Sequence, residues 1–232
     1  MHRVGEFVRR PYLKNIYNHF IDPLFLGPLK FREWKSALET DSVYFSRFPA
    51  ELGMVSVGFG SRAASVIDVS NANKKTNITI GKYVEIGKNL KILDTFGHDM
   101  DAVSQANFYI AFGKDVPEEE ITNLGPIVIG NDVGIAEDVT IMGNTVIHDG
   151  TVIGTKSLVS GEIPPYCLYG GVPAKLLRPR IDKELATRLQ RIAWWDLPPE
   201  VVWENRKLLR SNNVADALPK LEELAKKYRK SP

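Results

Sequence analysis

The chain has 232 residues and a formal net charge of +2, which allows one large domain or a domain plus an appendage and gives no reason to expect nucleic acid as a partner. Its single cysteine, Cys167, excludes an internal disulfide and suits a reducing compartment. The sequence shows neither the long apolar run of a membrane span nor the order of a secretory signal, so we predict a cytoplasmic location.

The first segment, residues 1–53, is predicted to be a partly helical N-terminal extension. Residues 1–36 are basic, and their aromatic and aliphatic residues recur at spacings of three to five, which indicates an amphipathic helix ending near Pro23. Two interpretations stay open. The helix covers one end of the domain that follows, or its basic surface makes peripheral contact with a membrane of anionic lipids.

Residues 54–178 are dominated by aliphatic side chains at every sixth position. This spacing fits neither the period of a strand nor that of a helix, and it is typical of a parallel β-helix in which each hexapeptide forms one side of a triangular coil. An ordinary β-sandwich would not repeat one spacing so often. Residues 61–79 keep the spacing poorly, which predicts an irregular first coil. The clear runs are Ile80, Ile86 and Ile92, and then Ile129, Ile135, Ile141, Ile147, Ile153 and Val159.

The repeat is interrupted after Ile92, where the next inward position is His98. The separation between Ile92 and Ile129 is not a multiple of six, so the chain is predicted to leave the coil as a protruding loop over residues 97–126. An imidazole fills an aliphatic core poorly, and long loops in compact domains are often functional, which makes His98 a candidate site residue. The loop's aromatic residues are expected to hold it on a neighbouring surface; they are Phe108, Tyr109 and Phe112.

Residues 179–232 are predicted to form C-terminal helices. The periodicity indicates helices over 182–193, from Pro198–Pro199 onward and over 214–229. We expect Trp194 and Trp195 to dock the first helix on the coil, and the tail to close the coil's open end, which otherwise exposes strand edges.

Several motifs make the chain resemble the hexapeptide-repeat acetyltransferases, above all the xenobiotic acetyltransferase branch of chloramphenicol and streptogramin acetyltransferases. The resemblance implies a left-handed parallel β-helix, a homotrimer with active sites between subunits, acetyl-CoA as co-substrate and no metal. The motifs are GHDMD (97–101), IGNDV (129–133), the hexapeptides up to IPPY (163–166), GGVPAK (170–175) and IAWWDLPPEVV (192–202).

The same resemblance implies the roles of individual residues. His98 matches the loop histidine that acts as general base, and a neutral imidazole can take the proton of an attacking hydroxyl. Asp99, Asp101 or a backbone carbonyl can orient the ring, and the sequence does not decide among them. The family's contacts to CoA fall on Glu137, Thr155, Ser160, Gly161, Lys175 and Arg178, and Lys156 is a further candidate.

Two positions depart from the family pattern. Gly134 stands where the family often has Trp, and Ser160–Gly161 replaces a Thr–Lys pair. The lost indole and the lost cation are expected to alter the CoA groove more than the fold.

The predicted function is acetyl-CoA-dependent O-acetylation of a sugar hydroxyl in a surface polysaccharide or its precursor, because the N-terminal third does not resemble the antibiotic enzymes. Alternatives are an antibiotic O-acetyltransferase and an amino-sugar N-acetyltransferase. Two further readings belong to other classes. One is a non-catalytic assembly module, and the other is a metal-dependent hexapeptide enzyme of the carbonic anhydrase type, for which the coil region offers only His98 and His148 as imidazole ligands.

Overall fold

The computed structural model describes residues 43, 45, 54–70, 75–94, 101–117 and 124–228, all within the unit Thr40–Pro232. Of the predicted N-terminal extension, residues 43 and 45 alone belong to this described part. Phe45 is buried and forms an isolated parallel bridge with Ile67. The expected amphipathic helix and its membrane contact therefore lie outside the described residues.

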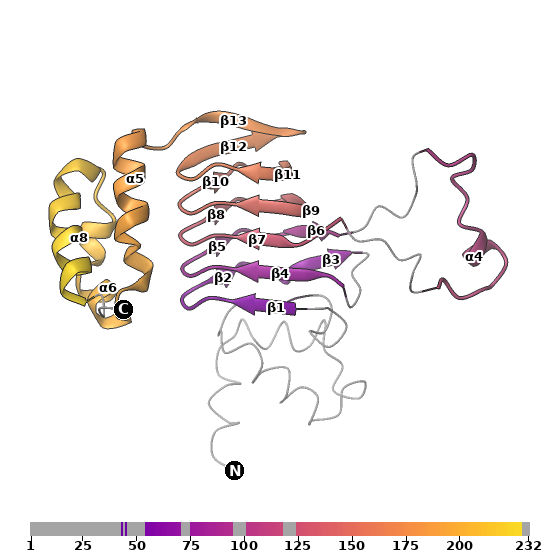
Figure 1. The fold of residues 1–232 in the computed structure, drawn as a ribbon, viewed down its shortest axis with the longest axis horizontal. Helices are drawn as coiled ribbons and strands as arrows, with labels where there is room; N and C mark the ends of the chain where they lie inside the picture. Colours follow the sequence, from indigo (N-terminus) through magenta and orange to yellow (C-terminus); the bar gives the residue numbers. More distant parts are fainter. Residues whose placement is uncertain are drawn as a thin grey trace, which may run out of the picture. The chain divides into compact units, whose positions relative to one another are not determined.

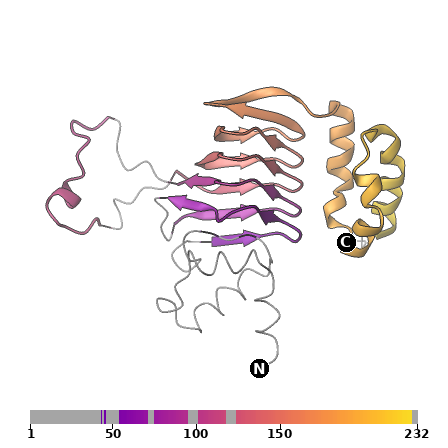
Figure 2. The same cartoon turned by 180° about the vertical axis from the view of Figure 1, so that it is seen from behind.

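A three-sided coil of short parallel strands forms most of the described chain, with its layers stacked in sequence order (Figures 1 and 2). Face one contains β1 (Met54–Val57), β4 (Asn77–Ile80), β7 (Ile127–Ile129) and the second halves of β9 (Thr140–Ile147) and β11 (Leu158–Ile163). Face two contains β2 (Arg62–Ala63), β5 (Glu85–Ile86), β8 (Gly134–Ile135), β10 (Val152–Ile153) and β12 (Cys167–Gly171). Face three contains β3 (Asp68–Ser70), β6 (Lys91–Leu93) and the first halves of β9 and β11.

The six-residue repeat places one aliphatic side chain of each strand in a buried column. On face one, Ile80 pairs with Ile129 and Ile129 with Ile147. Corresponding columns run through the other two faces, and all of these side chains are buried. The column on face two is Ile86, Ile135 and Ile153, and the column on face three is Ile92, Ile141 and Val159. The predicted hexapeptide β-helix is thereby confirmed.

The first coil is more regular than the sequence predicts. Strands β2 and β3 pair in parallel register with β5 and β6, and Ile67 and Val69 are buried like the later columns. The coil keeps its path because Val57, Ala63 and Val69 are themselves six residues apart and pair with Ile80, Ile86 and Ile92 of the next layer.

Three corners separate the faces, and we number them by the faces they join. The first corner joins faces one and two through turns at 58–61, 81–84, 130–133, 148–151 and 164–166. The second joins faces two and three at 64–67, 87–90, 136–139 and 154–157. The third joins faces three and one, and it contains the departure point of the long loop after Asp94 and the corner of β9 at Gly143.

Close approach of backbones requires glycine at two turns of the first corner, at Gly58 and Gly81. A Cβ on Gly81 would lie 2.5 Å from the carbonyl oxygen of Gly130, and a Cβ on Gly58 would lie 2.6 Å from the carbonyl carbon of Gly81. The amide of each glycine donates to the coil above, as Gly81 N does to Ile129 O at 2.7 Å. A larger residue at Gly58 or Gly81 would collide with the backbone of the next coil.

An antiparallel strand ends the coil. After β12 the chain reverses and β13 (Ala174–Pro179) pairs with it, with Gly171 opposite Ala174 and Cys167 opposite Pro179. The sequence analysis did not foresee this strand, because GGVPAK was considered only as a motif of the family. β13 covers the edge of β12, which would otherwise be open to pairing with another chain.

The C-terminal tail forms α5 (Lys183–Ile192), the 3-10 turn η3 (Trp194–Asp196), α6 (Pro199–Glu204), α7 (Arg206–Leu209) and α8 (Val214–Tyr228). The three expected helices are confirmed as α5, α6 and α8. Asp182 caps α5 by accepting a hydrogen bond from Glu184 N at 2.8 Å, and Ile192 packs in a common core with Leu218 and Leu221. Within the described residues, no helix combines the length and apolar character that crossing a membrane requires.

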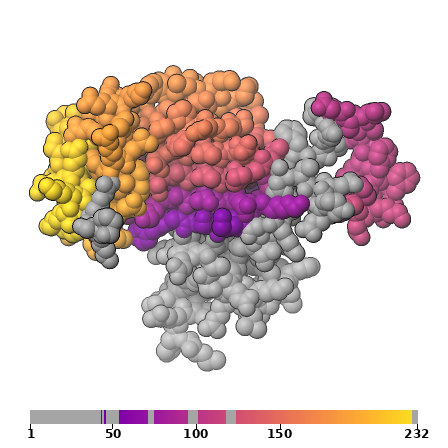
Figure 3. Space-filling model, in the orientation of Figure 1, coloured from indigo at the N-terminus to yellow at the C-terminus, as the bar shows by residue number. Residues whose placement is uncertain are grey.

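The tail does not close the open end of the coil, so this expectation is wrong. Both ribbon views place α5 and α8 beside the first corner, and the space-filling view shows them flanking the stacked layers (Figure 3). The reason is that the tail's anchoring residues find partners on the turns. Trp195 is buried, the ring of Trp194 lies 4.9 Å from that of Tyr83, and Lys82 Nζ contacts Asp196 Oδ1 at 2.9 Å. The prediction that the two tryptophans dock the tail on the coil is confirmed.

We predict that Gly81→Ala lowers the free energy of unfolding by about 2 kcal/mol, because the added methyl group meets backbone atoms that cannot move separately from the coil. Urea denaturation followed by circular dichroism measures the change. Gly134→Ala is the matched control, since its Cβ would meet only Val152 Cγ2 at 3.6 Å. Equal stability of the two variants would contradict the close-approach explanation.

Candidate functional site

The long loop contains the predicted catalytic histidine. His98 and its possible orienting partner Asp99 lie outside the described residues, whereas Asp101 begins an exposed turn. The described part of the loop contains α4 (Phe108–Ala111), which Asn107 caps by accepting a hydrogen bond from Ile110 N at 3.0 Å.

The loop presents apolar side chains that its own chain leaves exposed. Ile110 and Phe112 expose 74% and 73% of their surface, and Val103 and Phe108 are exposed as well. Phe108 and Phe112 contact each other with ring centroids 6.4 Å apart. Large apolar groups that remain exposed in one copy of a chain are typical of surfaces that another molecule covers.

The second corner brings together three of the residues predicted to bind CoA. The carbonyl oxygen of Glu137 accepts hydrogen bonds from Thr155 Oγ1 at 2.8 Å and from Lys156 N at 3.0 Å. All three residues are exposed in the turns of successive coils, and Lys156 adopts a left-handed φ of 56°. They therefore form one continuous edge with hydrogen-bonding groups and a cation.

Ser160 and Gly161 lie apart from that edge, on β11 at the third corner. Gly161 has a φ of 77° next to a break in the register between β11 and β9, and a Cβ there would meet nothing within 4 Å. Face three lies between this corner and the second one, so the two groups of predicted residues border the same face.

Lys175 and Arg178 lie on β13, opposite Gly170 and Leu168. Both side chains are exposed, and Arg178 Nη1 donates to the carbonyl oxygen of Pro179 at 3.0 Å. Among the described residues, no carboxylate forms an ion pair with Lys156, Lys175 or Arg178. These cations are thus available to phosphate groups.

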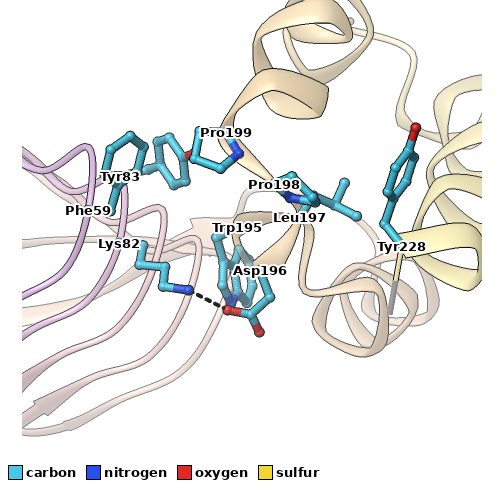
Figure 4. A pocket seen from close by; sticks show the side chains of 9 residues that line it. All are labelled: Phe59, Lys82, Tyr83, Trp195, Asp196, Leu197, Pro198, Pro199 and Tyr228. Carbon is cyan, nitrogen blue, oxygen red and sulfur yellow. Dashed lines mark hydrogen bonds and ion pairs between the residues drawn. The ribbon is translucent and has the colours of Figure 1, made fainter. Parts of the chain in front are cut away.

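A pocket of about 480 Å³ lies between the first corner and the tail (Figure 4). Its polar walls include Lys82 and Asp196, which are paired with each other, and it contains none of the predicted site residues. Its other lining residues are mostly aromatic or proline: Phe59, Tyr83, Trp195, Leu197, Pro198, Pro199 and Tyr228. The pocket belongs to the contact that docks the tail.

A partly buried ionic cluster supports the same corner. Asp149 Oδ1 accepts hydrogen bonds from Asn131 N at 2.6 Å and from Asn131 Nδ2 at 3.0 Å, and Arg180 Nη1 donates to the carbonyl oxygen of Gly150. Burial raises the pKa of Asp132 to about 6, an effect that Arg180 opposes and Asp149 reinforces. Burial also raises the pKa of Tyr166, with further contributions from Asp132 and Asp149.

His148, the other histidine of the coil region, has a structural partner. Its Nε2 lies 2.8 Å from Glu162 Oε1 on the surface of the coil. In the part of the chain that the structure describes, no three His, Cys, Asp or Glu side chains gather as metal ligands would.

The sequence analysis missed a buried polar pair at the root of the loop. Asp94, the residue after β6, is fully buried, and its carboxyl group accepts a hydrogen bond from the buried hydroxyl of Thr76. One signal was present in the sequence. Asp94 follows the inward Ile92 by two residues, so the alternation of a strand already directs its side chain toward the core.

Comparison with known proteins places the chain in a family. No model of a protein family matches it. It is 36% identical over 145 residues to a chloramphenicol acetyltransferase of Agrobacterium fabrum, covering 60% of this chain and 68% of that protein. It is also 36% identical over 159 residues to a probable macrolide acetyltransferase of Lysinibacillus sphaericus, covering 66% of this chain and 84% of that protein. The chain belongs to the xenobiotic branch of the hexapeptide-repeat acetyltransferases.

This acetyltransferase also matches proteins outside the antibiotic enzymes. A protein of Escherichia coli assigned to O-acetylation in lipopolysaccharide biosynthesis is 31% identical over 124 residues, covering 52% of this chain and 59% of that protein. A hexapeptide-repeat acetyltransferase of Vibrio cholerae, solved with acetyl-CoA bound, superposes on this chain with a TM-score of 0.49 at 21% identity. The match covers 74% of this chain and 85% of that protein. The predicted family and enzyme class are confirmed, and acetyl-CoA is the ligand of a solved relative.

We predict that the acetyltransferase loses stability as pH rises from about 4 to 7, through Asp132. Because the pKa of Asp132 is higher in the folded chain than in the unfolded one, burial costs less when its carboxyl group is protonated. The free energy of unfolding therefore falls as pH rises from the unfolded pKa to the folded pKa of about 6 and stays low above it. Asp132→Asn removes the titration, so the variant should exceed the wild type by roughly 1–3 kcal/mol at pH 8 and by less at pH 5.

Urea denaturation at both pH values measures this difference. Asp132 has a φ of 55°, which asparagine tolerates, so the turn is preserved. Asp138→Asn is the matched control, because Asp138 has a φ of 58° and is exposed. A stability difference for Asp132→Asn that stays the same at pH 5 and pH 8 would refute the assignment.

Proposed function

We propose that the protein is an acetyl-CoA-dependent O-acetyltransferase whose acceptor is a hydroxyl of an antibiotic-like small molecule, of the chloramphenicol or macrolide kind. The observation that carries this proposal is the identity to two antibiotic acetyltransferases over more than two thirds of their length. The sugar of a surface polysaccharide was our first prediction, and the comparisons favour the alternative, because the polysaccharide-related protein matches less of its length at lower identity.

In the proposed reaction, the His98 imidazole removes the proton of the acceptor hydroxyl as its oxygen attacks the thioester carbonyl of acetyl-CoA. The oxygen–carbon bond forms, the carbon–sulfur bond breaks, and CoA leaves as the thiol after taking up the proton. Asp99, Asp101 or a backbone carbonyl holds the ring in the tautomer that accepts a proton.

Cys167 supports direct transfer rather than an acetyl-cysteine intermediate. Its thiol is buried, burial raises its pKa, and its Sγ donates to the carbonyl oxygen of Pro164 at 3.0 Å. A buried thiol with a raised pKa supplies little thiolate, which is the nucleophilic form.

For acetyl-CoA, we propose contacts along the two borders of face three and on β13, which extends face two. Glu137, Thr155 and Lys156 lie on the second corner, and Ser160 and Gly161 lie on the third. Lys175 and Arg178, which lie on β13 without carboxylate partners among the described residues, are the proposed partners of the phosphates.

The proposed assembly is a homotrimer with active sites between subunits. It is supported by the loop, whose exposed apolar residues Val103, Phe108, Ile110 and Phe112 need a covering surface. A neighbouring copy of the coil would cover them and would place the His98 of one subunit beside the groove of another.

We predict that His98→Ala lowers kcat for acetyl transfer by at least about 100-fold with the KM for acetyl-CoA nearly unchanged, because the general base is lost while the cofactor contacts remain. Turnover of labelled acetyl-CoA is measured with a panel of chloramphenicol, a macrolide, a streptogramin, sugars and an amino sugar.

Each outcome of the panel decides between acceptors. Fastest turnover of a drug hydroxyl supports the proposal, whereas fastest turnover of a sugar hydroxyl restores the polysaccharide interpretation. An unchanged kcat in His98→Ala refutes the role of the histidine. A wild-type protein that binds no CoA favours a non-catalytic assembly module.

We predict that Lys175→Ala and Arg178→Ala each raise the KM for acetyl-CoA several-fold and make it less dependent on salt, with kcat changed little, because each variant removes a cation from the phosphates. Steady-state kinetics at two salt concentrations measures both effects. Lys183→Ala is the matched control, since Lys183 is an exposed cation of the tail. Equal behaviour of all three variants would count against the proposed phosphate site.

A further inference from the structure

The departure point of the loop is fixed by a buried polar contact. Strand β6 ends at Leu93, and Asp94 follows it into the core of the third corner, where its side chain is 0% exposed. The hydroxyl of Thr76, also 0% exposed, donates a hydrogen bond to the Asp94 carboxyl group. Burying a carboxyl group is costly unless it is hydrogen-bonded, so the bond from Thr76 stabilises the buried carboxyl group of Asp94.

The chain that returns from the loop contacts the same residue. Leu124 N donates to the carbonyl oxygen of Asp94 at 2.8 Å, and Asn144 N donates to the carbonyl oxygen of Gly125 at 3.0 Å. A Cβ on Gly143 would lie 2.6 Å from Leu124 Cβ and 2.7 Å from Asp94 Oδ1. The corner of β9 therefore packs directly against both ends of the loop.

The two ends differ in how tightly they restrict His98. Only three residues lie between Asp94 and His98, so their Cα atoms, four steps apart along the chain, can be at most about 14 Å apart whatever path the chain takes. The returning end at Leu124 is far more distant along the chain and sets no comparable limit. The position of Asp94 thus sets an upper limit on how far the imidazole can lie from the root of the loop.

We propose that Asp94 and Thr76 are positioning residues for the loop histidine. The inference rests on the proposed role of His98. The hydrogen bond between Thr76 and Asp94 is directional, so it holds Asp94 in one orientation at the departure point of the loop, where an apolar side chain of similar size would fill space without setting a direction. Neither residue is catalytic, because both are sealed in the coil.

The test compares Thr76→Val, which removes the donor at nearly constant volume, with Thr76→Ser, which keeps it. We expect Thr76→Val to lower kcat per folded subunit by about 10- to 100-fold with the KM for acetyl-CoA within twofold of the wild type, because small displacements of a catalytic group are costly. Thr76→Ser should recover most of the loss. Asp94→Asn keeps an acceptor for Thr76 and should fall between the two.

Thr151→Val is the matched control for a merely structural effect. Thr151 is 0% exposed, and its hydroxyl donates to the carbonyl oxygen of Pro164 at 2.6 Å at the first corner, away from the loop. This variant should lose stability as Thr76→Val does, yet keep the wild-type kcat per folded subunit.

A second readout does not depend on activity. Lys114 lies exposed in the described part of the loop, so tryptic cleavage after it reports how well the loop is held. We expect cleavage to accelerate several-fold in Thr76→Val and to stay unchanged in His98→Ala and Thr151→Val. A kcat in Thr76→Val within twofold of Thr76→Ser, or an unchanged cleavage rate, would overturn the inference. Absence of acetyl transfer in the wild type would instead refute the proposed function, while the cleavage result would still test the anchor.

Discussion

The structure depends on the parallel hydrogen bonding between successive coils, which forces equivalent residues into the same column. Because Ile80 pairs with Ile129 and Ile129 with Ile147, every sixth position must be apolar and of similar volume. The same stacking brings backbones so close at the first corner that Gly81 has no room for a Cβ. One constraint thus sets both the hydrophobic repeat and the glycines that punctuate it.

Because the coils stack in register, the turns of each corner line up, and each corner has its own structural role. The first corner docks the tail through Tyr83, Lys82 and their partners on η3. The second presents an unbroken edge in which the carbonyl oxygen of Glu137 accepts from Thr155 and Lys156. The third is the corner where the regular path is interrupted, and there the loop begins. A solenoid can accommodate a long insertion at one corner because the layers on either side still pair with each other.

The sequence was sufficient to predict the repeating coil, and it was insufficient for structural features that occur only once in the chain. The columns from Ile80 to Val159 follow from spacing alone, as does α5, whereas its cap at Asp182 came only from the structure. Strand β13 could not be predicted, because a single antiparallel strand of six residues produces no repeat in the sequence. The place of the tail beside the first corner depends on contacts between Trp194 and Tyr83, which are distant in sequence. The predicted cofactor residues came from resemblance, and only the structure shows that Glu137, Thr155 and Lys156 share one edge.

Asp94 illustrates why a polar residue belongs in this core. The aliphatic columns resist compression but exert little directional preference, since dispersion contacts change gradually as a side chain turns. A buried hydrogen bond tolerates far less misalignment before its strength falls. Asp94 lies at the point where the chain passes from β6, which pairs with β3 and β9, to the long loop. A directional bond at that position supplies the orientation that stacking can no longer provide.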